Sequence, residues 1–130
     1  MKFSEKLNNM RIAKGLTQSE LSEKIGVSIR SIYKYEAEQA APRRKIVFAN
    51  LSDVFGTPID FWKNDSDNDF ELMTEYLYGD YGKNEAERIV REVRGLFTGG
   101  KISEEDKDAL MKTLQDVYWE TKKIEKKQDV

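Results

Sequence analysis

The sequence predicts an all-α protein, and three kinds of observation support this fold class. Apolar residues recur three and four positions apart along most of the chain, which places them on one face of a helix. Ser or Thr precedes several of these segments, with an acidic residue three positions later, as in a helix capping box. Glycines follow the segments at the points where helices are expected to end. We therefore expect a chain of helices joined by short turns.

The clearest pair of helices lies within residues 17–36. Thr17 and Glu20 form a T-x-x-E capping box at the start of one helix, and Ser28 is placed to cap the next. Gly26 stands where the first of the two must stop and turn, a position that favours a left-handed backbone. The sequence thus predicts two short helices that meet at a sharp corner.

Three more helices are predicted around this corner. The first helix of the chain ends near Gly15, the fourth opens after Pro42 and stops at Gly56, and the short fifth opens with Thr57 as its cap and Pro58 at its first position. We expect these helices to complete a compact five-helix domain over residues 1–63. Their apolar positions are Phe3, Leu7 and Met10 in the first, Val47, Leu51, Val54 and Phe55 in the fourth, and Phe61 and Trp62 in the fifth.

Residues 3–62 resemble the repressor-type helix-turn-helix family of bacteria and their phages, also called the Cro, phage-repressor or XRE type. Ser22 stands where family members commonly have Ala, a small departure that leaves room for a close helix crossing. The resemblance implies a five-helix, repressor-like DNA-binding domain followed by a helical C-terminal region. It is carried by Thr17-Gln18, Leu21, Ile25-Gly26-Val27-Ser28, Ile32 and Tyr35-Glu36.

The function that this resemblance implies is sequence-specific binding of double-stranded DNA by a transcriptional regulator. We expect a repressor that binds a two-fold operator as a dimer, with helix 28–36 in the major groove. The main alternative is an antitoxin, or a protein-binding module controlled by an anti-repressor, whose DNA binding serves autoregulation. A protein anti-repressor or a protease is a further expected partner.

The same resemblance assigns roles to individual residues. The alternative for each residue is an exposed side chain on a solvated helix face, without a contact to DNA. A guanidinium such as that of Arg30 suits the O6 and N7 atoms of guanine, and an exposed Ile29 suits a thymine methyl group. Arg11 and Glu36 match a structural ion pair that braces the first helix against the end of the third. The expected base-reading residues are Ile29, Arg30, Tyr33 and Lys34, and the expected phosphate contacts are Gln18, Ser28, Arg43, Arg44 and Lys45.

The charge of the chain is unevenly distributed. Residues 1–50 hold ten Lys and Arg against five Glu, a net of +5, whereas residues 51–82 hold one Lys against eight acidic residues, a net of −7. Residues 83–130 hold eleven of each sign. A basic segment attracts phosphate whatever its sequence, and an acidic neighbour limits non-specific association. The basic segment is the one that contains the helical corner.

Residues 64–69 are polar and acidic, and we expect them to be a linker. Residues 70–130 then form a helical dimerisation or partner-binding region, which loosely resembles regulators of phages and integrative elements of Gram-positive bacteria. One helix should end at Gly79, a second before Gly99, and a third should begin at Ser103. The third carries a seam with gaps of 4, 3, 4 and 3, which packs either within its own subunit or across a dimer. The seam consists of Leu110, Leu114, Val117, Thr121 and Ile124.

Several function classes are disfavoured by composition. The chain has no Cys and no His, so disulfides and thiolate metal sites are excluded, and the most common general base and metal ligand are missing. We expect no enzymatic activity, no catalytic residues, no cofactor and no metal site. The acidic residues of the linker do not fit an EF-hand loop, since position 76 is Tyr where a Glu is required. No apolar run approaches the roughly 20 residues that span a bilayer, and we expect a cytoplasmic protein.

Overall fold

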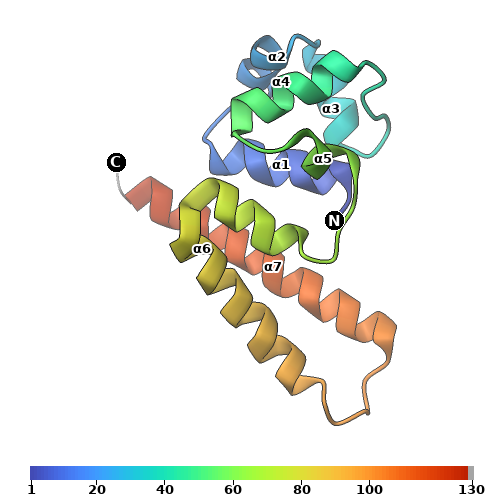
Figure 1. Cartoon of the computed structure of the whole chain (residues 1–130), viewed down its shortest axis with the longest axis vertical. Helices are drawn as coiled ribbons and strands as arrows, with labels where there is room; N and C mark the ends of the chain where they lie inside the picture. Colours follow the sequence, from blue (N-terminus) through green and yellow to red (C-terminus); the bar gives the residue numbers. More distant parts are fainter. Residues whose placement is uncertain (129–130) are drawn as a thin grey trace.

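The computed structural model describes the backbone of residues 1–128 and the side chains of residues 1–123, and within this part of the chain it contains seven helices and no strand. Helices α1 to α5 form a compact group, and the longer α6 and α7 extend away from it as a hairpin (Figure 1). The helices are α1 (Phe3–Ala13), α2 (Gln18–Ile25), α3 (Ile29–Glu36), α4 (Lys45–Phe55), α5 (Ile59–Lys63), α6 (Asp69–Leu96) and α7 (Glu104–Gln128). The predicted all-α class is confirmed.

The first five helices share one apolar core. α1 and α2 both pack against α3, and α4 packs against α2 and α5. The aromatic ring of Phe3 sits at the centre of an edge-to-face cluster, with ring centroids 5.9 to 6.1 Å from those of Tyr35, Phe48 and Trp62. The aliphatic part of the core includes Leu7, Met10, Val47 and Leu51, which were predicted as apolar positions of the first and fourth helices. Leu21, Ile25 and Ile32 of α2 and α3 are buried with them.

The corner between α2 and α3 forms as its capping residues predict. The Thr17 hydroxyl accepts a hydrogen bond from the Glu20 backbone N–H at 3.0 Å, and the Glu20 carboxylate accepts one from the Thr17 N–H at 3.1 Å. Gly26 ends α2 with φ of 72°, and the Ser28 hydroxyl accepts from the N–H of Ser31 at 3.0 Å. Because these interactions are local in sequence, they fix both helix starts without help from the rest of the fold.

Two predicted helix starts differ from the structure. Pro58, not Thr57, is the N-cap of α5, and the Thr57 hydroxyl instead accepts a hydrogen bond from the indole N–H of Trp62 at 2.7 Å. The Thr57 hydroxyl therefore serves as the acceptor of a buried indole N–H instead of capping α5. Helix α4 begins at Lys45 rather than directly after Pro42, which is buried in the loop that precedes it.

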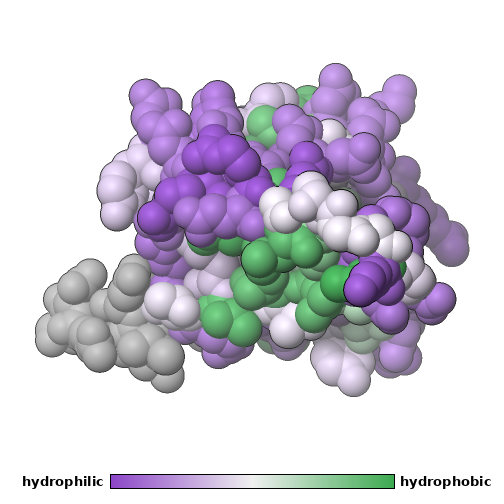
Figure 2. Space-filling model, turned by 90° about the horizontal axis from the view of Figure 1, so that it is seen from below, coloured by the Kyte–Doolittle hydropathy of each residue, from purple (hydrophilic) through white to green (hydrophobic). Residues whose placement is uncertain are grey.

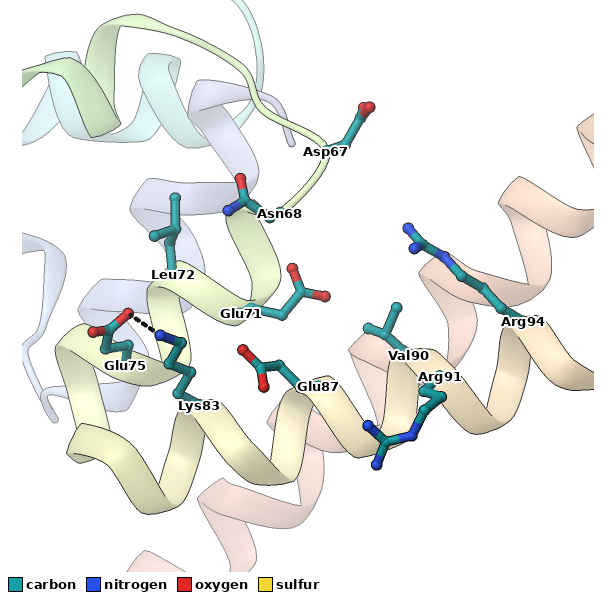
Figure 3. Close-up of a pocket in the computed structure, with 10 residues that line it drawn as sticks. All are labelled: Asp67, Asn68, Glu71, Leu72, Glu75, Lys83, Glu87, Val90, Arg91 and Arg94. Carbon is teal, nitrogen blue, oxygen red and sulfur yellow. Dashed lines mark ion pairs between the residues drawn. The ribbon is translucent and has the colours of Figure 1, made fainter.

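Helix α6 contains the predicted break at Gly79 as a sharp kink rather than as an end. Gly79 has φ of 73° and ψ of −157°, a conformation that side chains other than that of Gly rarely adopt. At Gly82 a Cβ atom would lie 2.6 Å from both the Thr74 carbonyl oxygen and the Tyr78 Cβ. The two glycines therefore let the halves of α6 diverge as a V, which Figure 3 shows in side view with its apex at the left.

The C-terminal hairpin is docked on the first five helices. α7 packs across α1 and the first half of α6, where the Phe70 ring lies 5.2 Å from that of Tyr118 and 5.8 Å from that of Trp119. The predicted linker is one residue too long, since Asp69 is the first residue of α6 and is buried. The segment also does not separate two independent units, because both α6 and α7 contact α1.

Within the described residues, no helix combines the length and the apolar character that crossing a bilayer requires.

Candidate nucleic-acid interface

The four predicted base-reading residues share the outward face of α3. Ile29 and Tyr33 keep 51% and 57% of their surface exposed, and Arg30 is exposed beside them. Lys34 is half-buried at the edge of this face. Successive helix residues are about 100° apart, so positions 29, 30, 33 and 34 form one face while Ile32 points into the core. An exposed face with two cations and two large apolar groups has the chemistry that major-groove edges require.

A hollow of about 670 Å³ lies between α3 and the loop that leads to α4. Ser28, Lys34, Arg43 and Arg44 line it, together with Ser31, which sequence reasoning did not single out. The structure thus brings four of the nine predicted DNA-contacting residues to one concave, basic surface. A sugar-phosphate backbone that runs along α3 would meet hydroxyl donors on one wall and guanidinium groups on the other.

Gln18 and Lys45 lie outside this hollow, each as the first residue of a helix. The first turn of α4 has no acidic side chain, and its N-cap Arg44 makes no side-chain capping bond. The Val47 N–H already donates to the Arg44 carbonyl at 3.2 Å, but the positive end of the helix dipole still favours an anion at this helix start. Gln18 is half-buried at the corresponding position of α2.

Arg11 and Glu36 form the ion pair that the resemblance implies. The guanidinium donates from Nε and Nη2 to the two carboxylate oxygens, each at 2.8 Å, and from Nη1 to the Leu16 carbonyl at 2.9 Å. The Asn8 side chain, which sequence reasoning missed, donates to Glu36 at 2.6 Å. Both charged groups are largely buried. The pair therefore fixes the C-terminal end of α3 against α1 and orients its exposed face.

Two further residues near the interface were not predicted. Asn50 donates a hydrogen bond from Nδ2 to the Ile25 carbonyl at 3.2 Å and so ties α4 to the end of α2. Ile46 is 54% exposed, directly after the basic residues at the start of α4. The contact of Asn50 depends on the tertiary fold and leaves no sequence signal. The position of Ile46 does leave a sequence signal, because it is an apolar residue directly after three basic ones.

The described residues of the predicted seam on α7 face outward. Leu110, Leu114 and Val117 are 45%, 38% and 55% exposed, whereas Tyr118 and Trp119 of the same helix are buried. The side chain of Ile124 lies outside the described residues. A view from the end of the molecule where α6 meets α7 shows a patch of apolar atoms (Figure 2). Packing inside the subunit therefore does not use these three seam residues.

A second hollow, of about 640 Å³, lies between the two halves of α6 (Figure 3). Its walls carry Glu71, Glu87 and Arg94, which point into the space between the halves, whereas the Arg91 side chain turns away from it. Burial raises the pKa of the Glu71 carboxyl above its usual range, an effect that Arg94 opposes only in part. Among the described residues no group of three or more acidic side chains could hold a metal ion.

Replacing Glu71 with glutamine is expected to stabilise the fold at pH 7. Because the folded-state pKa is raised, stability is full below the unfolded-state pKa of about 4.5 and falls as pH rises toward the folded-state value. The gain should be at most about 1 kcal/mol, since Glu71 is only half-buried and solvent screens it. Urea unfolding at pH 7 and pH 3.5 measures it, with Glu92→Gln as an exposed control on the same helix. A loss of stability at pH 7 would contradict the expectation.

Comparisons with known proteins agree with this architecture. The sequence model of the Helix-turn-helix family matches residues 7–62, the part of the chain that holds most of α1 to α5. The chain is also similar to a Bacillus subtilis (strain 168) protein named as the SPbeta prophage-derived uncharacterized HTH-type transcriptional regulator YonR. The two are 28% identical over 111 residues, which cover 84% of this chain and 89% of the relative. The similarity therefore extends into α6 and α7. No solved structure matches the chain significantly.

Proposed function

We propose that this chain is a sequence-specific DNA-binding transcriptional regulator, which represses by occupying a two-fold operator as a dimer. The observation that carries the proposal is the exposed face of α3, held by the buried Arg11–Glu36 pair within a helix-turn-helix domain. The similarity to a protein named as a transcriptional regulator supports it.

In this proposal α3 enters the major groove, which is about 12 Å wide and admits one helix. Arg30 and Lys34 reach base edges, while Ile29 and Tyr33 contact thymine methyl groups or the backbone. The positive start of α4 and the neighbouring arginines hold phosphates on one side of the groove, and Gln18 holds them on the other. Repression then needs only occupancy of a promoter, without contact to another protein.

The alternative is a module that binds another protein and uses DNA only for autoregulation. The exposed seam of Leu110, Leu114 and Val117 is compatible with it. Such a surface suits a different partner as well as a second copy of the chain. The molar mass of the purified protein in solution distinguishes these two hypotheses. A dimer supports the operator-binding repressor, and a monomer supports the partner-binding module.

Selection of bound duplexes from a random DNA pool tests the proposal as a whole. A two-fold regulator should enrich sequences with inverted symmetry, whose half-sites lie about one helical turn of 34–36 Å apart. Enrichment of unsymmetrical sequences would argue against the dimeric mode. Absence of any enrichment over the starting pool would rule out sequence-specific binding.

Replacing Arg30 with alanine should weaken binding to the selected site by about 1 to 3 kcal/mol and relax the base preference at one position in each half-site. The reason is that a bidentate guanidinium contact discriminates guanine from the other bases. Fluorescence anisotropy with the selected duplex and with each single-base variant measures both effects. Arg88→Ala, which removes an exposed arginine from α6, is the matched control. Equal weakening on selected and random DNA would assign Arg30 to phosphate alone.

Replacing Arg44 with alanine should reduce the salt dependence of binding. If Arg44 neutralises one phosphate, the slope of log K against log salt becomes shallower by about 1, because one fewer counterion is released. Titrations at several salt concentrations on specific and random duplexes give this slope. Lys101→Ala, in the turn between α6 and α7, should leave it unchanged. An unaltered slope for Arg44→Ala would place this side chain away from the backbone.

A further inference from the structure

We propose that Lys6 and Asp69 are positioning residues that set which half-site spacing the dimer accepts. They would do so by fixing the α6–α7 hairpin at one orientation relative to α3. This inference rests on the proposed function, since a spacing preference exists only for a dimer that reads two half-sites. It concerns the buried joint formed by Lys6 and Asp69, which includes none of the DNA-facing residues of α3 and none of the seam residues of α7.

Lys6 is a fully buried cation at the centre of this joint. Its side chain is 0% exposed, and its Nζ donates to the backbone carbonyls of Phe61 at 2.6 Å and Asn64 at 2.7 Å. The same Nζ lies 3.2 Å from Oδ2 of Asp69. One ammonium group therefore connects α1, the C-terminal end of α5 and the first residue of α6.

Asp69 supplies the matching buried anion. Its side chain is 2% exposed, and Oδ2 accepts a hydrogen bond from the Ser66 backbone N–H at 2.9 Å. The amino group of Met1 also lies 3.1 Å from Oδ2, and the exposed carboxylate of Asp65 lies 3.9 Å from the Lys6 ammonium. Directional bonds thus hold both ends of the pair, so the carboxylate has one well-defined position.

The joint and the apolar packing beside it have different consequences for geometry. Apolar contacts such as the edge-to-face pair of Phe61 in α5 and Tyr76 in α6, with ring centroids 5.3 Å apart, hold the hairpin against the first five helices. They restrain small displacements less steeply than a charge-assisted hydrogen bond does. A buried ion pair often contributes little net stability, because desolvation offsets its attraction. It does, however, penalise any displacement that separates the charges. The packing therefore keeps the hairpin attached, and the ion pair selects one orientation.

This orientation has a direct effect on the operator. In a dimer joined through α7, the separation of the two α3 helices depends on the angle between each hairpin and its own α3. Each added base pair moves a half-site by about 3.4 Å and rotates it by about 35°. A fixed joint should therefore confine tight binding to one spacing, while a loosened joint should accept neighbouring spacings.

The first test measures the distance between the first five helices and the hairpin in the intact chain, without DNA. The protein has no native cysteine, so Glu23→Cys and Lys101→Cys give two unique sites for spin labels. Electron-electron double resonance between them should give a narrow distance distribution in the parent and a distribution at least about twice as wide in Lys6→Met/Asp69→Asn. Replacing both partners leaves no unpaired charge at position 6 or 69, and the amide oxygen at position 69 remains as an acceptor for the Met1 amino group. Lys2→Met/Glu38→Gln, an exposed pair, is the control and should stay narrow.

A second variant keeps the proposal testable if the double variant does not fold. Asp69→Glu keeps the charge but moves the carboxylate by one methylene group, so it should fold and shift the mean label distance. An unchanged distribution in both variants would show that apolar packing alone orients the hairpin, which overturns the proposal.

The second test uses the duplex recovered by selection, with its half-site separation changed by one to three base pairs. The parent should lose at least about tenfold in affinity per added or removed base pair, and the joint variants should lose less or prefer another spacing. Affinity for a single half-site should be equal in all proteins. A parent that accepts every spacing equally would overturn the inference while DNA binding stands. A parent that binds no selected duplex would instead refute the proposed function, and the label distances would still decide the role of the joint.

Discussion

Replacing Glu36 with alanine should destabilise the protein by about 3 to 5 kcal/mol, because it leaves the Arg11 guanidinium buried without its counter-charge. The same change removes the acceptor of the Asn8 side chain. Since a domain of this size is stable by only about 5 to 15 kcal/mol, the variant should be close to unfolding at physiological temperature. Urea denaturation followed by circular dichroism measures the loss.

Glu38→Ala is the matched control for this prediction. Glu38 also pairs with a cation, Lys2, but both side chains are about 60% exposed. Exposed pairs contribute between about 0 and 1 kcal/mol, so the control should be nearly neutral. Similar small losses for Glu36→Ala and Glu38→Ala would show that the Arg11–Glu36 pair does not brace α3.

The second large effect is expected from the seam on α7. Glutamate at both Leu114 and Val117 should dissociate the proposed dimer and lower affinity for a two-fold operator by about 10²- to 10⁴-fold. The loss is large because the second half-site contact then no longer gains from linkage to the first. Sedimentation gives the oligomeric state, and fluorescence anisotropy gives the affinity.

The comparison with a single half-site makes this prediction specific. Binding to one half-site should be unchanged, since α3 and its bracing pair are distant from the seam in sequence and untouched by the change. Ala109→Glu adds a negative charge at an exposed position of α7 outside the seam and should leave the dimer intact. A dimer that survives both seam substitutions would place the interface elsewhere, and the seam would then have no role in operator binding.

Local signals in the sequence predicted the first domain well. The capping box of Thr17 and Glu20, the left-handed Gly26 and the cap at Ser28 depend on neighbours within four residues, and each forms as expected. The face of α3 follows from the helical period, because burial of Ile32 leaves the opposite residues exposed. Of the candidate site, the sequence could therefore assign the residues of α3 to one surface. It could not show that the loop before α4 encloses a hollow with them.

Long-range contacts account for the differences. The sequence predicts Thr57 as a helix cap, but in the folded core its hydroxyl accepts a hydrogen bond from the Trp62 indole. The sequence predicts the acidic segment before α6 as a linker. Residues near Asp69 in sequence do not indicate that it pairs with Lys6, which is 63 positions away. Sequence patterns record which groups need partners, but they do not record which partner the fold supplies.

The sequence by itself determined the helical class, the corner between α2 and α3 and the outward face of α3, because these depend on capping, glycine conformation and helical period. Only the tertiary structure decided how the C-terminal region is placed. The periodicity of the seam was visible in the sequence, but Leu110, Leu114 and Val117 are exposed because Tyr118 and Trp119 occupy the inward side of α7. Two apolar faces on one helix compete for the same core, and packing volume, which a linear pattern does not contain, decides which face is buried.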